Sequence, residues 1–398
     1  MQVAGQPLYV DLFAGCGGIS LGLYNAGWRG LFAIEKSGMA FRTLKHNLIE
    51  KKNHFDWPAW LPMTEHSIVD VLKNYRHELE KLQGKVDLVA GGPPCQGFSL
   101  AGLRKEDDER NKLVDSYIKF VGLVKPKMLF FENVMGFAIG FKSLSGRGNA
   151  YSEYVKKELS LLGYDTRNKI VDFSEFGIPQ RRKRFILVGM LDEFAEQYFE
   201  SIYRRKKAFL ESKGLKEYVS LWEALSDLER KHGEVDSLEY PGFKEGVYGK
   251  TESSYQKWVR SQRDKKLPDS HRFANHRKEI IDRMKFILEN CPRDRGLTED
   301  FKSRLGLKKQ CITPLGGWSN CPSLTTLPDD YIHYCEPRIL TVREYARIQS
   351  FEDWYEIMDR YTTGGRRRKV EVPRYTQIGN AVPPLFAELS GTVFKAIV

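Results

Sequence analysis

The stretch Leu8-Tyr9-Val10-Asp11-Leu12-Phe13-Ala14-Gly15-Cys16-Gly17-Gly18 decides the fold of this chain. Its first six residues are mostly apolar and indicate a buried strand, and the glycines that follow end the strand before a helical pattern begins. Glycine lets the backbone approach a ligand closely, and the start of a helix offers free N–H groups. We therefore expect a strand–turn–helix unit with a ligand-binding turn.

Further apolar runs extend this pattern along the first half of the chain, at residues 31–34, 86–90, 128–131 and 185–188. Helical patterns lie between them, at residues 113–124 and 151–162. Alternating strands and helices predict βαβ units, a mostly parallel sheet and an α/β fold. Charged residues with interleaved aromatics dominate residues 197–310, where we expect a second, smaller domain or a large insertion.

Composition narrows the class of protein. The 398 residues are 41% apolar and 29% charged, and no apolar run approaches the length of a membrane-spanning helix. The first residues lack the pattern of a signal peptide, and the six scattered cysteines form no CxxC pair, so reduced thiols in the cytoplasm are expected. The net charge of +11 favours a polyanionic partner, most simply nucleic acid. No metal site is predicted, because zinc-ligand spacing is missing from Cys311, Cys321, His333 and Cys335.

Glu35 ends the second apolar run, eighteen residues after Gly17. An acidic residue at such a position can accept hydrogen bonds from both hydroxyls of a ribose, so we expect a nucleoside-containing cofactor. A dinucleotide site would carry a third glycine where this chain has Ser20. The form Asp-x-Phe-x-Gly-x-Gly-Gly suits a methionine-bearing nucleoside better, and the residues leave both alternatives open.

A second loop brings a thiol to the same edge of the predicted sheet. The residues Gly91-Gly92-Pro93-Pro94-Cys95-Gln96-Gly97-Phe98-Ser99 follow the apolar run at 86–90, and their glycines and prolines predict a rigid loop. Loops after the carboxyl ends of parallel strands face the ligand crevice. Cys95 is therefore a candidate nucleophile, and the alternative is a small apolar residue that fills the loop.

Other stretches complete a set: Phe130-Phe131-Glu132-Asn133-Val134, Gln180-Arg181-Arg182-Lys183-Arg184, a helical block at Arg338–Phe351, and Gln377-Ile378-Gly379-Asn380-Ala381-Val382-Pro383-Pro384. In this order and spacing they resemble the DNA (cytosine-5) methyltransferase family, over the whole chain except roughly residues 190–320. The resemblance implies a Rossmann-like, S-adenosylmethionine-dependent methyltransferase sheet with a smaller, irregular target-recognition domain. The expected boundaries are 1–190, completed by 373–398, for the catalytic domain and 191–372 for the target-recognition domain and hinge.

The resemblance also implies catalytic roles. The Cys95 thiolate would add to carbon 6 of cytosine, which activates carbon 5 toward a methyl group. Glu132 would protonate ring nitrogen 3 or donate a hydrogen bond to it. Arg184 would contact the cytosine oxygen, and Arg182 would hold the loop and a phosphate.

For S-adenosylmethionine, the resemblance places Phe13 on the adenine, Glu35 on the ribose and the first turn around the methionine portion. The family often has Asp-Ile at the adenine edge, where we align Ser67-Ile68, and nearby Asp70 is the alternative. The implied cofactor-binding residues are Asp11, Phe13, Ala14, Gly15, Gly17, Gly18, Glu35, Ser67, Ile68, Leu113, Asn380 and Ala381.

For the substrate, the resemblance implies flipping of a cytosine out of double-stranded DNA. Gln96 and Ser99 would lie on a loop that closes on the DNA, and Thr325 would contact the nucleotide near the flipped base. The stretch Asp269–Arg277 either reads DNA or forms a solvated helix, and the helix is favoured slightly. A compact chain of this type fits a bacterial enzyme that acts as a monomer and is paired with a cognate restriction endonuclease.

Three alternatives remain. A tRNA cytosine methyltransferase of the same family is the nearest, although the long basic middle disfavours it. An NAD-dependent oxidoreductase accounts for the first strand–turn–helix unit alone. A non-catalytic DNA-binding relative is disfavoured because Cys95 and Glu132 are both present.

Overall fold

The computed structural model of the protein describes residues 5–94, 111–138, 142–143, 146–147, 151–262, 266–307, 309, 311–364, 367 and 370–397. The chain divides into two compact units. The first comprises Met1–Asp172, Lys183–Lys207 and Phe386–Val398, and the second comprises Phe173–Arg182 and Ala208–Leu385. Within the described residues, no helix has both the length and the apolar character needed to cross a membrane.

These packing units differ from the predicted domain boundaries in three segments. Residues 191–207 belong to the first unit, whereas residues 173–182 and 373–385 belong to the second. The segment 173–182 contains the first part of the Gln-x-Arg-x-Arg stretch, and the segment 373–385 contains the whole Gly-Asn-Ala-Val stretch. Their side chains take part in the packing of the second unit, which a division by composition along the chain does not reveal.

A six-stranded sheet forms the centre of the first unit, in the order β2-β1-β3-β4-β9-β7. The strands are β1 (Leu8–Leu12), β2 (Arg29–Ile34), β3 (Leu88–Gly91), β4 (Met128–Val134), β7 (Asp165–Asp172) and β9 (Lys183–Met190). The first four strands pair in parallel, and β9 is antiparallel to both β4 and β7. The five predicted strands are confirmed. Strand β7 was not predicted, because it is a polar edge strand with exposed residues and carries a weak apolar signal.

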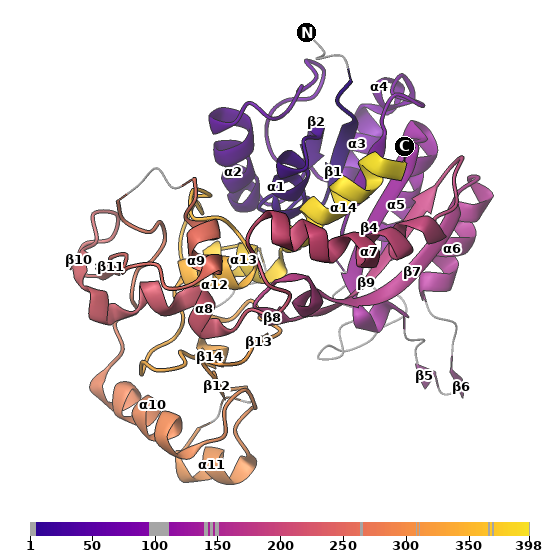
Figure 1. Cartoon of the computed structure of the whole chain (residues 1–398). Helices are drawn as coiled ribbons and strands as arrows, with labels where there is room; N and C mark the ends of the chain where they lie inside the picture. The colour runs from indigo at the N-terminus through magenta and orange to yellow at the C-terminus, as the bar shows by residue number, and fades with distance from the viewer. Residues whose placement is uncertain are drawn as a thin grey trace. The chain divides into compact units, whose positions relative to one another are not determined.

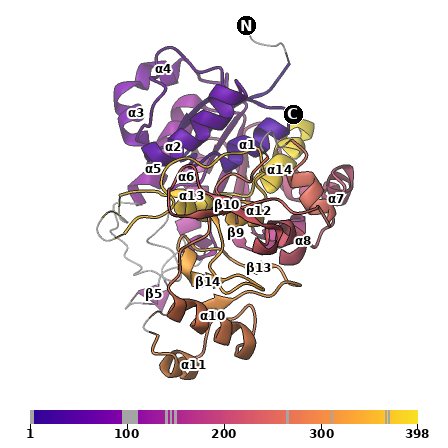
Figure 2. The ribbon, with the colours of Figure 1, turned by 90° about the vertical axis from the view of Figure 1, so that its left-hand side faces the viewer.

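Helices cover both faces of this sheet. Leu129 and Phe131 lie in a core cluster with α3 (Ile68–Asn74), α5 (Asn111–Val124) and α6 (Tyr151–Leu161). Phe130 points to the other face, where it contacts Phe394 of α14 (Pro384–Ile397). Tyr198 of α7 (Glu196–Ser212) stacks on the ring of Phe394. Figures 1 and 2 show α14 and α7 on one side of the sheet and α3 and α5 on the other.

The remaining helices of this unit are α1 (Gly18–Asn25), α2 (Gly38–Leu44), η1 (Lys45–Lys51), α4 (Arg76–Glu80) and η2 (Met135–Ala138), and a short hairpin pairs β5 (Lys142–Ser143) with β6 (Gly146–Arg147).

The parallel strands fix the location of the candidate site. Because β1, β2, β3 and β4 run in the same direction, their carboxyl ends meet at one edge of the sheet. The residues that follow these ends are the glycine turn after β1, Glu35 after β2 and Gly92 after β3, and Glu132 lies near the end of β4. Four stretches that are far apart in sequence therefore share one edge.

The second unit is built from short elements. Its helices are η3 (Phe173–Phe176), α8 (Leu221–Leu225), η4 (Ser226–Leu228), η5 (Arg230–His232), α9 (Ser254–Val259), α10 (Lys278–Asn290), α11 (Glu299–Arg304), η6 (Pro328–Asp330), α12 (Val342–Ile348) and α13 (Arg374–Asn380). Its strands pair two by two: β10 (Glu234–Asp236) with β11 (Lys244–Gly246), β12 (Thr313–Pro314) with β14 (Tyr331–Ile332), and β8 (Gln180–Arg181) with β13 (Cys321–Pro322).

Helix α12 is shorter than the predicted block at Arg338–Phe351 and is fully buried despite its charges. Arg347 pairs with Asp227 and Asp353, and Glu344 accepts two hydrogen bonds from Arg338. Burial alone would raise the pKa of Glu344, but the Arg338 guanidinium lowers it well below its usual value. The charged pattern therefore reflects paired ions inside the unit rather than a solvated helix face.

The prediction of a solvated helix at Asp269–Arg277 is wrong. Asp269 and Ser270 form a turn, and the backbone at residues 271–273 pairs with β11: the Gly246 N–H donates to the carbonyl of His271, and the Phe273 N–H donates to the carbonyl of Lys244. His271 and Phe273 are buried. The alternation of apolar and polar side chains suits an added strand beside β11, which charge content alone did not indicate.

Candidate active site

The turn after β1 has the backbone conformation of a ligand-binding loop. Gly15 and Gly17 have positive φ values of 57° and 87°, which favour glycine. Phe13 also has a φ of 58°, an uncommon conformation for a residue with a side chain. The N–H of Ala14 donates to the carbonyl of Ile34, which ties the turn to the end of β2. The sequence thus places Phe13 at the edge of the sheet in a conformation that the surrounding contacts maintain.

Glu35 lies directly beside this turn. One carboxylate oxygen accepts a hydrogen bond from the Gly15 N–H at 2.9 Å, and the other accepts one from the Ser37 N–H at 2.7 Å. Burial raises the pKa of Glu35, although these backbone N–H groups oppose the shift. A Cβ atom built on Gly15 would meet nothing within 4 Å, so open space adjoins the carboxylate. This arrangement fits the ribose of a nucleoside cofactor.

Asp11 supports the same turn from inside the unit. Its side chain is completely buried, and one oxygen accepts a 2.6 Å hydrogen bond from the Ser20 hydroxyl. The other oxygen has no hydrogen-bond partner among the described residues. Burial raises the pKa of Asp11 to about 7, with a smaller contribution from the charge of Glu35. Cys16 is buried as well.

The segment aligned with the adenine edge lies next to Glu35. The N–H of His66 donates to the carbonyl of Glu35 at 2.8 Å. Ser67 precedes α3 as its N-cap, and its hydroxyl makes no capping hydrogen bond. Ile68 is buried in the core, whereas Asp70 is exposed in the first turn of the helix. Ser67 therefore follows directly on the residue tied to Glu35, and Leu113 packs against the same core from α5.

The residues predicted to carry the nucleophile and the closing loop, Cys95, Gln96 and Ser99, lie outside the described residues. The start of the loop is described. The Asn133 amide donates to the carbonyl of Pro93 at 3.2 Å and accepts from the N–H of Val134. A Cβ atom on Gly92 would come within 3.0 Å of a Glu132 oxygen. Asn133 had no predicted role, although its place in the Glu-Asn-Val stretch was the available signal.

Glu132 and Arg184 form an ion pair at this edge. The Arg184 Nε lies 3.0 Å from a Glu132 carboxylate oxygen, and both side chains are about one-seventh exposed, at 14% and 13%. Burial lowers the pKa of Arg184, and the neighbouring Glu132 opposes the shift. A carboxyl group and a guanidinium so placed can form hydrogen bonds to a planar, polar ring. The fold thus unites two residues 52 positions apart in sequence.

The remaining predicted residues belong to the second unit. Arg182 is buried and donates to the carbonyls of Leu324 and Gly379, at 3.2 and 2.9 Å. Thr325 donates a 2.6 Å hydrogen bond to Asp330, and its carbonyl closely approaches Gly379, where a Cβ atom would meet it at 2.6 Å. Asn380, which is exposed, and Ala381 follow directly. The described contacts of Arg182 therefore position the Thr325 segment against α13.

Buried hydrogen bonds between glutamine side chains link the segments that contain Gln180, Leu324 and Ile378. Gln180 accepts from the N–H of Leu324 and donates to the side chain of Gln349. Gln349 in turn donates to the carbonyl of Ile378. Both glutamines are completely buried, so each amide requires these partners. These hydrogen bonds explain why the glutamines of two separate motifs lie together, against the backbone of a third motif at Ile378, a role that the sequence did not indicate.

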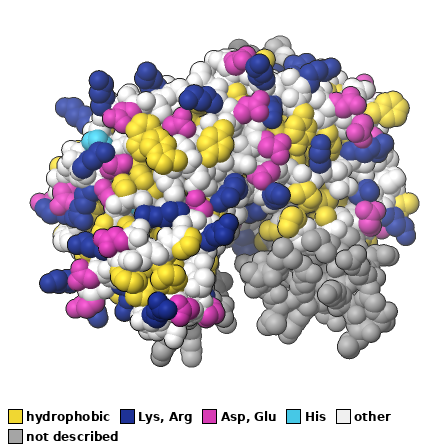
Figure 3. All heavy atoms as spheres, turned by 60° about the horizontal axis from the view of Figure 1, so that its bottom comes forward, with side chains coloured by type: hydrophobic (Ala, Val, Ile, Leu, Met, Phe, Trp, Pro, Cys, Tyr) yellow, Lys and Arg dark blue, Asp and Glu magenta, His cyan; other side chains and the backbone are white. Residues whose placement is uncertain are grey.

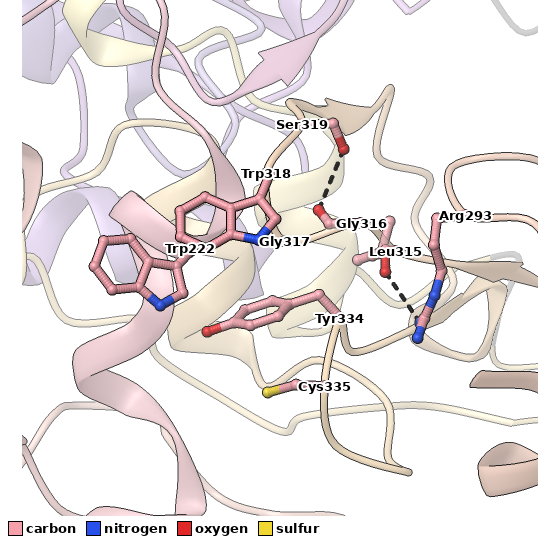
Figure 4. Close-up of a pocket in the computed structure, with 9 residues that line it drawn as sticks. All are labelled: Trp222, Arg293, Leu315, Gly316, Gly317, Trp318, Ser319, Tyr334 and Cys335. Atoms are coloured by element: carbon pink, nitrogen blue, oxygen red, sulfur yellow. Dashed lines mark hydrogen bonds between the residues drawn. The ribbon is translucent and has the colours of Figure 1, made fainter. Parts of the chain in front are cut away.

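The second unit also has an open pocket of about 570 Å³ (Figure 4). Trp222 and Trp318 stack beside it with ring centroids 5.1 Å apart, and Trp318 is 74% exposed. The backbone N–H of Trp222 donates to the carbonyl of Gly317, and this hydrogen bond holds in place the loop that carries Trp318. A fixed, exposed indole of this kind can stack on a planar ring. The residues that line the pocket are Trp222, Arg293, Leu315, Gly316, Gly317, Trp318, Ser319, Tyr334 and Cys335.

Comparison with known sequences identifies similar proteins over nearly the whole chain. The model of the family described as C-5 cytosine-specific DNA methylase matches residues 9–395. The Type II methyltransferase M.DdeI of Desulfomicrobium norvegicum is 31% identical, over 95% of this chain and 86% of its own length. The Type II methyltransferase M.XorII of Xanthomonas oryzae pv. oryzae is 30% identical, over 98% of this chain and 85% of its own length.

Solved structures resemble the fold. An E. coli prophage protein, described as a candidate DNA modification methyltransferase, superposes with a TM-score of 0.66 at 22% identity, over 98% of this chain and 99% of its own. The S. pombe Dnmt2 methyltransferase gives a TM-score of 0.54 at 13% identity, with 98% of each chain covered. The predicted Rossmann-like α/β fold is confirmed.

Proposed function

The chain belongs to the C-5 cytosine-specific DNA methylase family, and on that premise we propose the details of its reaction. It transfers a methyl group to carbon 5 of a cytosine within a short, specific sequence of double-stranded DNA. The cytosine leaves the helix stack, and Cys95 forms a transient covalent bond to its carbon 6.

One observation supports this proposal most strongly. The Glu132–Arg184 ion pair lies at the carboxyl ends of the parallel strands, and Gly92 is in close approach to Glu132. Asn133 holds the carbonyl of Pro93, two residues before Cys95. The residues assigned to the cytosine ring are thus adjacent to the start of the loop that carries the assigned nucleophile.

We assign S-adenosylmethionine as the methyl donor, which is an electrophilic methyl source when bound. The ribose would lie on Glu35, whose oxygens are already aligned by the N–H groups of Gly15 and Ser37. Phe13 would pack on the adenine, and Ser67 and Ile68 would line its edge. The open space at Gly15 supports this assignment. Asn380 and Ala381 are assigned to the methionine portion by their motif.

The Cys95 thiolate adds to carbon 6, while Glu132 supplies a proton or hydrogen bond to nitrogen 3 and Arg184 binds the ring oxygen. Carbon 5 then takes the methyl group from the sulfonium of the donor, which would be left as a neutral thioether, and carbon 5 loses its proton to a base, which we assign to water. The bond between Cys95 and carbon 6 breaks as the double bond of the ring is restored.

The second unit is proposed as the target-recognition region, with Thr325 near the flipped nucleotide and Gln96 and Ser99 on the closing loop. We further propose that the protein acts as a monomer on DNA in the bacterial cytoplasm. A paired restriction endonuclease is proposed because the similar proteins are named Type II methyltransferases.

Methylation of plasmid DNA, read by bisulfite sequencing, tests the proposal. The expected result is methylcytosine at one short recurring sequence with the wild-type protein and none with Cys95→Ala. Trapping on DNA that contains 5-fluorocytosine should give a covalent complex with the wild type alone. Substantial methylation by Cys95→Ala would exclude the covalent route, and turnover on tRNA but not on duplex DNA would favour the alternative substrate.

A further inference from the structure

Arg272 lies on the strand beside β11, where its side chain points to the face opposite to the side chains of His271 and Phe273. His271 and Phe273 point to one face, because a Cβ atom on Gly246 of β11 would meet both of their rings. Arg272 pairs with Glu245 in an antiparallel bridge, and its side chain points to the opposite face. Hydrogen bonds from the N–H groups of Gly246 and Phe273 fix the strand on both sides of it.

Three aromatic rings hold the Arg272 guanidinium. Its central carbon lies 4.8 Å from the ring centroid of Tyr240, 4.0 Å from that of Phe243 and 3.9 Å from that of Tyr361. Stacking of this kind orders a long side chain without using its N–H groups. The direction of the guanidinium is therefore set before any ligand arrives.

The hydrogen-bond donors of this arginine are unused. Among the described residues, no oxygen accepts a hydrogen bond from Arg272, and its Nε is buried without a partner. Two acidic residues of the surrounding segments have other partners: Glu245 accepts from the Ser237 hydroxyl at 2.6 Å, and Glu239 pairs with Arg374. An ordered arginine with free donors and partial exposure is suited to an external anion.

Other stacked arginines of the second unit differ in this respect. Arg260 lies over the ring of Tyr248 at 4.2 Å, yet it donates to Asp227 and to the carbonyl of Gly249. Arg374 lies over Tyr361 and also bonds to Glu239 and to the Ser270 hydroxyl. These two arginines are internally satisfied, whereas Arg272 is not. On the face seen in Figure 3, Lys and Arg side chains are interspersed with Asp and Glu, so charge density alone does not mark a contact.

We propose that Arg272 binds a backbone phosphate of the DNA substrate. The proposal rests on the proposed function, because the DNA supplies the anion. Arginine matches phosphate through parallel N–H donors, and because Nε is buried, the terminal Nη N–H groups of Arg272 are assigned to the phosphate. A phosphate contact positions the duplex but does not read its sequence, so Arg272 is expected to contribute affinity uniformly across sequences.

The test is the salt dependence of DNA binding, measured by fluorescence anisotropy with a labelled duplex from about 50 to 200 mM salt. Arg272→Met should reduce the slope of log K against log salt by about 0.9, which corresponds to one phosphate contact. Binding at a fixed salt concentration should weaken roughly tenfold or more. Arg272→Lys should retain the slope, because the charge remains.

Tyr361→Phe is the matched control within the same cluster. It removes a buried hydroxyl that has no partner among the described residues and leaves the ring that stacks on Arg272. Its slope should equal that of the wild type. Thermal unfolding and binding of S-adenosylmethionine report whether each variant is folded. If Arg272→Met does not fold, Arg272→Gln decides, because it also removes the charge but keeps a polar side chain, and its slope should likewise be lower by about 0.9.

An unchanged slope for a folded Arg272→Met or Arg272→Gln would overturn the proposal and assign the arginine to packing alone. That result leaves the proposed function intact as long as the wild type binds and methylates DNA. Failure of the wild type to bind duplex DNA would instead remove both proposals.

Discussion

The Nε of Arg184 lies 3.0 Å from a carboxylate oxygen of Glu132, across the antiparallel pair of β9 and β4. Arg184 faces Val134 directly, and Glu132 is two positions before Val134, so the two charged side chains are diagonal neighbours on one face of the sheet. The register of two strands, rather than a flexible loop, therefore sets the geometry of the pair.

Glu132→Gln should leave the fold and cofactor binding intact and reduce the rate of methyl transfer by about 10²–10⁴-fold. The amide keeps the shape of the side chain but loses its acid function and its charge interaction with Arg184. Single-turnover methylation of saturating DNA measures the effect. Retention of more than about a tenth of the wild-type rate would contradict the role proposed for Glu132.

Gly92→Ala should reduce the rate of methyl transfer indirectly, by displacing the carboxylate of Glu132. The new methyl group would lie 3.0 Å from a Glu132 oxygen, so the carboxylate must shift. We expect a lower kcat of about 10-fold or more, since small displacements at a reacting centre have large effects. Gly296→Ala is the control, because a Cβ atom there meets nothing within 4 Å and no positive φ is involved. Equal activity of the two variants would be evidence against tight packing at Glu132.

Glu35→Gln should weaken binding of S-adenosylmethionine by about 10- to 100-fold, as expected for loss of charge-assisted hydrogen bonds. Both carboxylate oxygens accept from backbone N–H groups, and the glutamine amide would set an NH₂ group against one of them. Isothermal titration calorimetry measures the affinity. Glu80→Gln, an exposed change on α4, should bind the cofactor like the wild type. Unaltered affinity of Glu35→Gln would remove Glu35 from the cofactor site.

Asp11 should make stability depend on pH. Burial raises its pKa from 3.8 to about 7, so the unfolded chain ionises first as pH rises, and the folded state loses stability between about pH 4 and pH 7. Asp11→Asn does not titrate. The unfolding free energy of the variant minus that of the wild type should therefore increase across this window, by up to about 4 kcal/mol, and stay constant above it. Urea unfolding at several pH values checks this, and a flat difference would contradict the shifted pKa.

Five strands of the central sheet follow from local sequence, because Leu8–Phe13 and the later apolar runs need burial on both faces. The sequence also determined the order of the motifs, and hence which edge of a parallel sheet carries them. Strand β7 was not predicted, because a polar edge strand lacks the apolar run that buried strands show. Helix α12 was predicted, but the predicted block was longer than the helix. Its charged residues are paired inside the unit, which the sequence pattern does not show.

Which side chains meet depends on contacts between segments that are far apart in the sequence. The register of β4 and β9 brought Arg184 to Glu132, and a single residue of slippage would have sent one of them to the opposite face. Arg182, two residues earlier, instead became an internal link between Leu324 and Gly379. Arg272 was left with three rings and no acceptor among the described residues, although its sequence surroundings suggested a solvated helix. Local patterns specify which elements form, whereas long-range contacts specify which polar groups are satisfied and which stay available to a ligand.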